Sequence, residues 1–374
     1  MKSKLSVFLI LGLIGSISLT GILAPDKLFS AKEKRKLQQF PEFTIAGFWD
    51  KSYQKKMEKY TLDQFPNRNH WVQQKKVIDC MAGYQETGNV YLASDGYLID
   101  CFRSYPPEQF EKNAQMLSVF AERIRTEYKL PVHAILVPTA AHIFKDKLPA
   151  GAPTAYQQSM TARMRELGVP LVDVSAMLQN HSAEPLYYHT DHHYTSLGAW
   201  YCYQAWRMER GLPEANEKDW TKEILCENFY GTTYAKASLP WISPDTITAW
   251  YQNPSHPVTY NGSEQESSLY HRKALSGQDP YKVFLNSNQA LSVIEGSGSS
   301  GKLLLIKDSF GNTFAQFPVE EFRQVHVIDP RFFGGNVEDY IRENGITEIL
   351  FVYGMENFSQ DLFLPAFLSE IQDS

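Results

Sequence analysis

The stretch Leu303–Asn312, LLLIKDSFGN, is an apolar run that ends in polar residues where a helix can begin. Successive aliphatic residues are typical of a strand buried on both faces, as in a parallel sheet covered by helices. Ser309 follows this strand, so its hydroxyl would be exposed and its backbone N–H would lie at a helix N-terminus. The stretch therefore predicts a parallel α/β sheet with a candidate nucleophile at the end of one strand. The plainer alternative is that Ser309 only caps a helix.

Similar apolar runs occur on both sides of this stretch and alternate with helical patterns. The expected strands are Val132–Val137, Pro170–Val174, Val325–Asp329 and Ile349–Tyr353. Apolar residues at helical spacing predict helices over residues 107–124, 155–167 and 337–343. Because ligands gather at the carboxyl ends of parallel strands, a functional site is expected there.

Candidate binding residues follow the last two of these strands. Gly334, Gly335 and Asn357 are candidate donors of an oxyanion hole beside the serine. Tyr353, which ends the last strand, and Lys307, which precedes Asp308, are further candidates for binding. Turn chemistry is the alternative for the glycines and the asparagine, because both residue types suit turns for conformational reasons.

A second motif, DHHYTS at Asp191–Ser196, lies more than a hundred residues before the serine. Asp191 and His193 are close enough for one loop to present both. The carboxylate would hold one imidazole nitrogen while the other nitrogen faces Ser309 and takes its proton. His192 is expected to point elsewhere, because neighbouring residues of an extended loop alternate in direction.

The histidine motif also permits two other interpretations. His189, Asp191, His192 and His193 could form a metal site, although no second cluster of ligands with recognisable spacing accompanies them. Alternatively, the histidines are buried and hydrogen-bonded residues with a purely structural role.

Taken together, DHHY at Asp191–Tyr194 and DSF at Asp308–Phe310 resemble motifs of the SGNH-hydrolase-like proteins of the alginate O-acetylation type. The chain is most similar to their Gram-positive relatives named for a DHHW motif. The acid and the histidine precede the serine, which is the permuted motif order of that family. Asp63–Arg68 and Phe229–Thr232 also look like family features, so the resemblance covers about residues 30–370.

The resemblance implies an SGNH-hydrolase-like, three-layer α/β fold with a parallel central sheet and a β-rich insertion. It would make Ser309 the nucleophile, His193 the base and Asp191 the acid that orients it. Lys307 stands where the usual block of the family has Gly, and Tyr194 replaces the Trp of DHHW. The Lys307 side chain would narrow the site or bind an anionic sugar.

The function implied by the resemblance is acetyl transfer to, or removal from, a cell-surface polysaccharide. The reaction would pass through an acetyl-serine intermediate and would need no metal or organic cofactor. A membrane-bound O-acyltransferase would be the partner that delivers the acetyl group across the membrane. A non-catalytic protein of the same fold, acting as a glycan-binding or scaffold protein, is the alternative.

The N-terminus indicates the compartment. Lys2 and Lys4 precede an apolar run from Leu5 to Ala24 without a charge, which is long enough to span a bilayer as a helix. We expect residues 1–24 to be an uncleaved signal anchor and the body of the protein to lie outside the cytoplasm. A cleaved secretory signal is the alternative.

Three further regions follow the anchor. Residues 25–45 are polar and basic and are expected to form a tether, followed by one α/β domain over residues 46–374. Within this domain, helical spacing predicts a helix pair over Phe48–Tyr84, and an Asp-Gly turn predicts a hairpin over Asn89–Asp100. Residues 207–300 are less regular and are expected to be a β-rich insertion, with short strands at Phe229–Tyr234, Thr246–Trp250 and Val283–Leu285.

Composition excludes few classes of function. The chain has 374 residues, 43% of them hydrophobic, and a net charge of −6, which argues against nucleic acid as a partner. Aromatic residues make up 13%, a content compatible with glycan binding or simply with a large core. The four cysteines, Cys80, Cys101, Cys202 and Cys226, leave disulfides and free thiols equally open.

Overall fold

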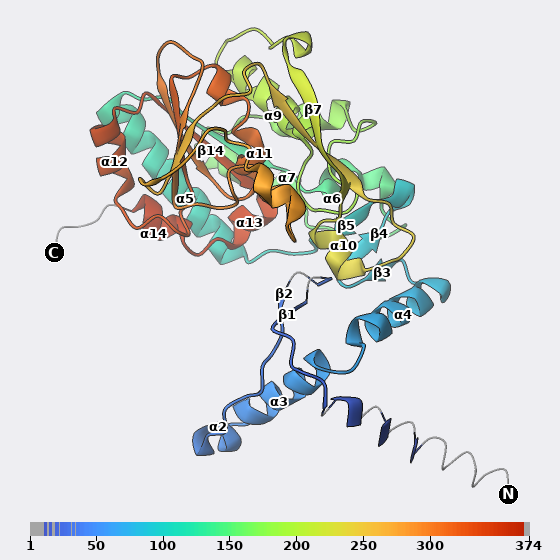
Figure 1. Ribbon diagram of the computed structural model, residues 1–374. Helices are drawn as coiled ribbons and strands as arrows, with labels where there is room; N and C mark the ends of the chain where they lie inside the picture. Colours follow the sequence, from blue (N-terminus) through green and yellow to red (C-terminus); the bar gives the residue numbers. More distant parts are fainter. Residues whose placement is uncertain are drawn as a thin grey trace, which may run out of the picture. The chain divides into compact units, whose positions relative to one another are not determined.

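The structure is a computed structural model that describes residues 11–12, 15–16, 19–21, 23–30, 32–33 and 35–369 (Figure 1). The described residues form two compact units. Unit 1 comprises those of 1–88 and 234–241, and unit 2 comprises those of 89–233 and 242–374. The predicted anchor, residues 1–24, lies largely outside the described residues, and the predicted domain boundaries stay predictions. Across the described parts of the chain, no helix has the length and apolar character needed to cross a membrane.

The centre of unit 2 is a mixed sheet of seven described strands in the order β10-β9-β11-β13-β12-β14-β6. The strands are β6 (Val132–Val137), β9 (Val258–Tyr260), β10 (Glu264–Glu266), β11 (Leu291–Glu295), β12 (Lys302–Lys307), β13 (Gln324–Ile328) and β14 (Glu348–Gly354). Strands β13, β12, β14 and β6 are parallel, as their continuous apolar sequences predict. The segment expected to be β-rich adds β11, β9 and β10 to one edge as antiparallel strands.

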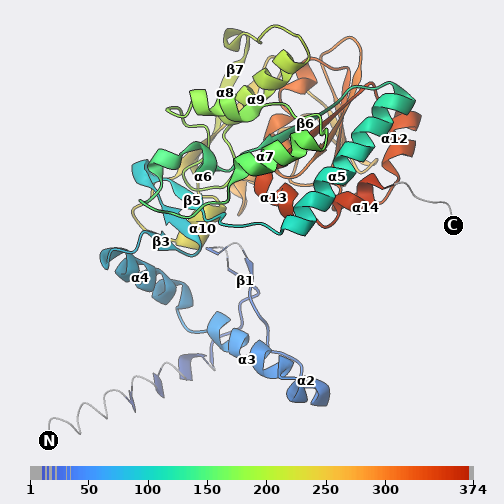
Figure 2. The ribbon, with the colours of Figure 1, turned by 180° about the vertical axis from the view of Figure 1, so that it is seen from behind.

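Helices cover both faces of this sheet and make the three layers. The helices of unit 2 are α5 (Pro107–Arg123), α6 (Ala140–Ile143), α7 (Gln157–Glu166), α8 (Val174–Asn180), α9 (Ser196–Glu209), α11 (Phe310–Phe314), α12 (Val337–Asn344), α13 (Met355–Gln360) and α14 (Leu364–Leu368). Helices α5, α12 and α14 lie together on one face, as the opposite views in Figures 1 and 2 show. Alternate residues of β12 enter the two cores: Leu304 and Ile306 pack with α5, whereas Leu303 and Leu305 pack with α9.

Three expected strands are absent from the described structure. Leu171 makes only a single bridge to Ala134, because α8 begins two residues after Val172 and ends the extended run. Val283 lies in a 3-10 helix, η6 (Pro280–Val283), and Leu285 adopts a left-handed backbone conformation. Around Phe229–Tyr234, strand β7 (Thr221–Phe229) ends and α10 (Thr232–Ala237) begins.

One predicted hairpin and one predicted strand are confirmed. Strands β4 (Val90–Leu92) and β5 (Leu98–Asp100) form an antiparallel pair across the Asp-Gly turn. The run at 246–250 lies in β8 (Asp245–Tyr251), which pairs with β7. All four cysteines are free thiols, with Cys101 and Cys202 buried.

Unit 1 contains the predicted helix pair, α3 (Ser52–Asp63) and α4 (Arg68–Met81), together with α2 (Ile45–Trp49) and the short strands β1 (Phe29–Ser30), β2 (Arg35–Lys36) and β3 (Glu86–Thr87). Asp63 is buried and accepts hydrogen bonds from both terminal nitrogens of Arg35, at 2.9 and 2.6 Å, and from the backbone N–H of Gln38. The Arg35 guanidinium holds the pKa of Asp63 at about 2. Asp63–Arg68 therefore ties the N-terminal segment to the helix pair through an ionic contact.

Candidate active site

Ser309 occupies the N-cap position between β12 and α11, but its side chain makes no capping hydrogen bond. Its hydroxyl oxygen instead lies 2.7 Å from Nε2 of His193. A helix-capping role therefore does not explain why a serine stands at this position, because its hydroxyl is directed at an imidazole.

Asp308 fixes the turn on which the serine lies. One of its carboxylate oxygens accepts the backbone N–H of Phe310 at 2.9 Å. The other accepts the backbone N–H of Gly354 at 3.0 Å and Nδ2 of Asn357 at 2.7 Å. Burial raises the pKa of Asp308, and the Asn357 side chain and the two backbone donors oppose that shift. The serine turn is thus fastened to the end of the neighbouring strand β14.

Asp191 and His193 lie together on the other side of the serine, and both are buried. Nδ1 of His193 is 2.6 Å from Oδ1 of Asp191, and the backbone N–H of His193 donates to the same oxygen at 3.0 Å. Oδ2 of Asp191 accepts the backbone N–H of Thr232 at 2.7 Å. The three predicted residues therefore meet in the order carboxylate, imidazole and hydroxyl, although their catalytic roles stay predictions.

The surroundings of Asp191 keep its carboxylate ionised. Burial alone would raise the pKa of Asp191, but the neighbouring His192 and His193 and the hydrogen bonds hold it well below its usual range. A carboxylate in this state orients the imidazole and stabilises the imidazolium that forms when it takes a proton.

Because Gly231 has no side chain, the side chain of Asp191 can lie directly against its backbone. A Cβ atom added to Gly231 would lie 2.2 Å from Cβ of Asp191 and 2.3 Å from Oδ2. The stretch Phe229–Thr232 thus contributes a residue without a side chain and then a backbone N–H that binds the acid. The sequence marked this stretch by resemblance only and did not reveal its contact with the acid.

The loop that carries the histidine is held at both of its ends. Asp245 accepts the backbone N–H groups of His189 and Thr190 at 2.9 and 2.8 Å. At the other end, the Tyr194 hydroxyl donates to the carbonyl oxygen of Phe310 at 2.8 Å. Tyr194 therefore links the histidine loop directly to the serine turn.

Asp191, His192 and His193 also form a group of possible metal ligands, with atoms within 4.8 Å of one another. His189, the fourth expected ligand, instead lies with Nδ1 3.0 Å from Asp245. The 2.6 Å between His193 and Asp191 is a hydrogen-bond distance, whereas two ligands of one zinc ion at about 2.0–2.2 Å would lie farther apart. The arrangement therefore fits a proton-transfer pair better than a metal site.

Tyr281, from η6, is a member of the site that sequence reasoning missed. Its ring stacks on the His193 imidazole, with centroids 4.2 Å apart and an interplanar angle of 13°. Its buried hydroxyl donates to the carbonyl oxygen of Ser309 at 3.3 Å and lies 2.8 Å from Oγ1 of Thr313. Tyr281 therefore fixes the plane of the imidazole relative to the serine turn.

Replacing Tyr281 tests this positioning role. Tyr281→Leu removes the stacking and should lower kcat about 100-fold with little change in KM, because the imidazole loses its orientation. Tyr281→Phe keeps the ring and should lower kcat by about tenfold or less. Steady-state kinetics on an activated acetyl ester measure both. Equal losses in the two variants, or a change confined to KM, would contradict the role.

The remaining predicted site residues lie in other settings. Lys307 is only 1% exposed, and its ammonium donates to Oδ1 of Asn288 at 2.8 Å and lies 3.4 Å from Asp329. Burial lowers the pKa of Lys307 to about 8, against the opposing effect of Asp329. Its side chain thus faces the protein interior. Tyr353 is likewise buried, in the core on the α5 side of the sheet.

Gly334 and Gly335 lie on an exposed stretch between β13 and α12. A Cβ on Gly334 would meet nothing within 4 Å, and one on Gly335 would meet only the Phe333 ring. Asn357, in contrast, lies beside the serine turn and retains a second amide N–H after binding Asp308. Of the candidate oxyanion donors, Asn357 is the one that the structure brings to the site.

A shallow hollow adjoins the site, with about 450 Å³ of empty space that includes open solvent at its mouth. Its walls are Leu98, Ile99, Asp100, Val137, Pro138, Thr139, Ala140, Ala141, Asp191, His192, Phe310, Gly354, Met355, Glu356 and Asn357. It therefore lies at the carboxyl ends of β6 and β14, which is the edge of the sheet where the sequence predicts a ligand.

The chain resembles known proteins in sequence and in fold. A family model described as DHHW protein matches residues 126–328. A DHHW family protein from Eubacterium siraeum is 25% identical, with a TM-score of 0.65 over 75% of this chain and 95% of that chain. Bacillus cereus PatB1 with a sulfonyl adduct is 19% identical, with a TM-score of 0.61 over 73% of this chain and 98% of that chain. A second structure of Bacillus cereus PatB1 has the same TM-score at 20% identity and the same coverage of both chains.

No curated protein matches the sequence. The structural likeness confirms the expected SGNH-like α/β fold.

Proposed function

The chain belongs to the DHHW protein family, and from this membership we propose that it transfers acetyl groups to a cell-surface polysaccharide. The observation that carries the proposal is the contact of 2.7 Å between His193 Nε2 and Ser309 Oγ, with Asp191 2.6 Å behind the imidazole. A serine alone is a weak nucleophile, and a base at hydrogen-bond distance with an orienting acid is what activates it.

The reaction proceeds in two transfers. In the first, His193 takes the Ser309 proton, the serine oxygen attacks the carbonyl carbon of the acetyl donor, and the protonated His193 gives its proton to the leaving group. In the second, His193 deprotonates a sugar hydroxyl, whose oxygen attacks the acetyl carbon of acetyl-Ser309. The bond between that carbon and Oγ breaks, and the protonated His193 returns the proton to the Ser309 oxygen. Asp191 stabilises the imidazolium in both transfers, and the second N–H of Asn357 is the candidate donor to the oxyanion.

The hollow beside the site is the proposed place of the acceptor sugar. It combines an apolar wall with a few polar side chains, among them Asn357, Glu356 and Asp100, a combination that suits the faces and hydroxyls of a sugar ring. Whether a sugar or water reaches acetyl-Ser309 decides between transferase and esterase.

The cellular setting is also part of the proposal. The apolar run of residues 5–24 would anchor the chain in the membrane with its catalytic unit outside the cytoplasm. Acetyl groups would then come from a membrane-bound O-acyltransferase partner, because activated acetyl donors are made in the cytoplasm.

The test is an acetyl-transfer assay on purified full-length protein. The protein is incubated with p-nitrophenyl acetate and cell-wall glycan fragments, and mass spectrometry measures acetyl esters on the glycan and free acetate. Glycan-bound ester supports the transferase, and acetate release alone indicates an esterase. Glycan binding with neither product would overturn the proposal in favour of a non-catalytic glycan-binding protein.

A further inference from the structure

Unit 1 carries an apolar helix face without a partner among the described residues. Ile45, Phe48 and Trp49 of α2 are spaced at i, i+3 and i+4 and so share one face of the helix. Ile45 is 73% and Trp49 77% exposed. Phe43 and Phe40, which precede α2 in the chain, are more than half exposed, and Phe40 packs against Tyr60 of α3. We call the three residues of α2, together with Phe40 and Phe43, the α2 patch. Contiguous apolar surface of this kind in a protein marks a place of interaction.

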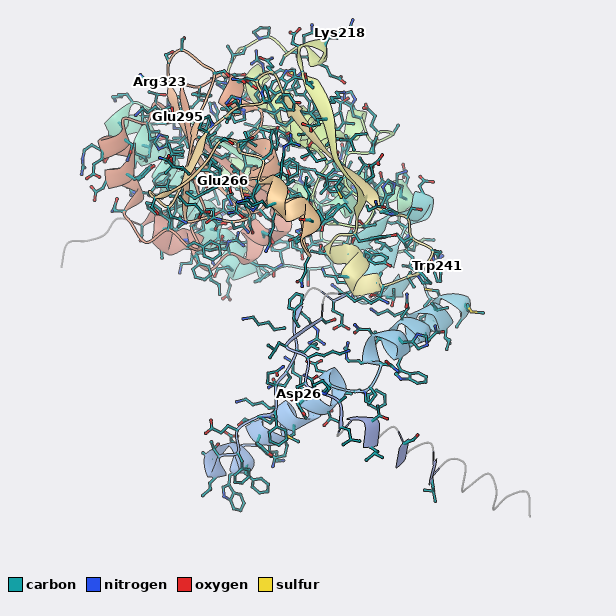
Figure 3. The ribbon with its side chains drawn as sticks, in the orientation of Figure 1. Asp26, Lys218, Trp241, Glu266, Glu295 and Arg323 are labelled. Atoms are coloured by element: carbon teal, nitrogen blue, oxygen red, sulfur yellow. The ribbon has the colours of Figure 1, made fainter. Side chains whose placement is uncertain are left out.

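The α2 patch is held in a defined shape. The ring of Phe43 packs against Phe48 and against Tyr53 of α3, with centroids 6.1 and 5.2 Å apart. The Thr44 hydroxyl caps α2 by accepting the backbone N–H of Gly47 at 3.0 Å. Figure 3 shows aromatic rings standing out from α2 at the end of α3 that is farther from α4. The exposed rings are thus presented by a short capped helix and not by a loose loop.

Basic side chains border the α2 patch. Lys51, Lys55, Lys56 and Lys59 follow α2 directly, and all four are exposed. Residues 25–88 contain twelve Lys and Arg against eight Asp and Glu, whereas the whole chain has a net charge of −6. Unit 1 therefore carries positive charge on a chain that is otherwise strongly acidic, and its apolar tip lies within the positive part.

We propose that the α2 patch lies in the interface of a bilayer that contains anionic lipids, with the rings among the upper acyl chains and the lysines at the headgroups. Trp and Phe beside Lys are the side chains that favour this depth, because apolar rings leave water while ammonium groups reach phosphate. Each lysine near an anionic surface adds attraction that salt screens. The uncharged run of residues 5–24 ends sixteen positions before Phe40, the first residue of the patch, so both would meet the same membrane.

A lipid surface fits these observations better than a protein partner. A protein interface centred on exposed aromatic residues needs matched hydrogen-bonding groups at its rim to fix one orientation. The exposed charged side chains near the α2 patch are those four lysines and three acids, Glu42, Asp50 and Glu58. The lysines are in excess, and their long, flexible side chains suit a fluid layer of phosphates. The proposal is independent of the acetyl transfer at Ser309, because it concerns where the chain is held and not what it catalyses.

The experiment measures tryptophan fluorescence of the full-length protein in vesicles. The vesicles consist of phosphatidylcholine with or without phosphatidylglycerol, and each composition is prepared with ordinary and with brominated acyl chains. We expect brominated vesicles containing phosphatidylglycerol to quench part of the emission. Trp49→Ala should lose that part, and the double variant Lys55→Gln/Lys56→Gln should show it reduced and less sensitive to salt.

Trp241→Ala is the matched control. Trp241 is 55% exposed and lies on a part of unit 1 away from α2 (Figure 3), so its removal should leave the quenching unchanged. Because Trp49 is mostly exposed, its replacement should not affect folding, and a thermal melt of each variant checks this. Equal quenching in Trp49→Ala and the wild type would overturn the proposal. Equal quenching in vesicles with and without phosphatidylglycerol would overturn it as well.

Discussion

Ser309→Ala should lower the turnover of an acetyl ester by a factor on the order of 10⁴ or more, because it removes the nucleophile and leaves only binding and the oxyanion donors. The same variant should no longer gain mass from phenylmethylsulfonyl fluoride, which sulfonylates activated serines. The hydroxyl contacts the His193 imidazole and caps no helix, so its loss leaves the turn held by Asp308 intact. Intact-mass spectrometry and a steady-state assay measure both effects.

His192→Gln is the matched control for this experiment. His192 belongs to the same loop, and its Nδ1 lies 2.8 Å from Oγ1 of Thr232 and 3.4 Å from Asp191. Its replacement would weaken the electrostatic support of Asp191 but leave the base in place, so the variant should retain activity within about tenfold. His193→Gln should lose activity as completely as Ser309→Ala. Equal labelling of wild type and Ser309→Ala would contradict the assignment of Ser309. Equal losses at both histidines, together with inhibition by a chelator, would instead favour the metal site.

The strands that carry the site were predictable because burial on both faces leaves an unbroken apolar run. Leu303–Ile306 and Ile349–Tyr353 are such runs, and they pair in parallel as expected. Their polar carboxyl ends then lie together, which brings Asp308 to Asn357. The run at Pro170–Val174 has the same composition, but the helix that follows leaves room for one bridge only. An apolar composition therefore predicts the burial of a segment more reliably than it predicts whether the segment pairs as a strand.

The contact between His193 and Ser309, unlike the strands, could not be predicted from a local pattern, because 116 residues separate the two and no spacing rule connects them. The residue types, an acid, a base and a nucleophile, suggested that the two motifs meet, and the family resemblance supported that prediction. Tyr281 and Gly231 come from the irregular segment, where a ring contact or the lack of a side chain has no signature in the local sequence. For Lys307 the sequence suggested a contact that the structure does not show. A lysine next to a candidate nucleophile suggested substrate binding, whereas its ammonium is buried and donates to Asn288.

Gly231→Ala should lower kcat about 100-fold although Gly231 need not touch substrate. The added methyl group would overlap the Asp191 side chain, with 2.2 Å between the two Cβ atoms. Asp191 or the backbone must move, and displacement of about 1 Å in a catalytic group can cost a factor of that order. Overpacking should also reduce the free energy of unfolding by about 1–3 kcal/mol. Steady-state kinetics well below the melting temperature, with a thermal melt, separate the two effects.

Gly334→Ala provides the comparison, because a Cβ there would meet nothing within 4 Å and the residue is exposed. Neither glycine has the left-handed conformation that would strain an alanine, so steric overlap with Asp191 is the difference between them. Gly334→Ala should therefore keep both its activity and its melting temperature. If Gly231→Ala kept full activity, the orientation of Asp191 would not limit the rate, and the acid would have a structural role only. If Gly334→Ala lost activity, the exposed glycine stretch would regain its place as a candidate oxyanion site.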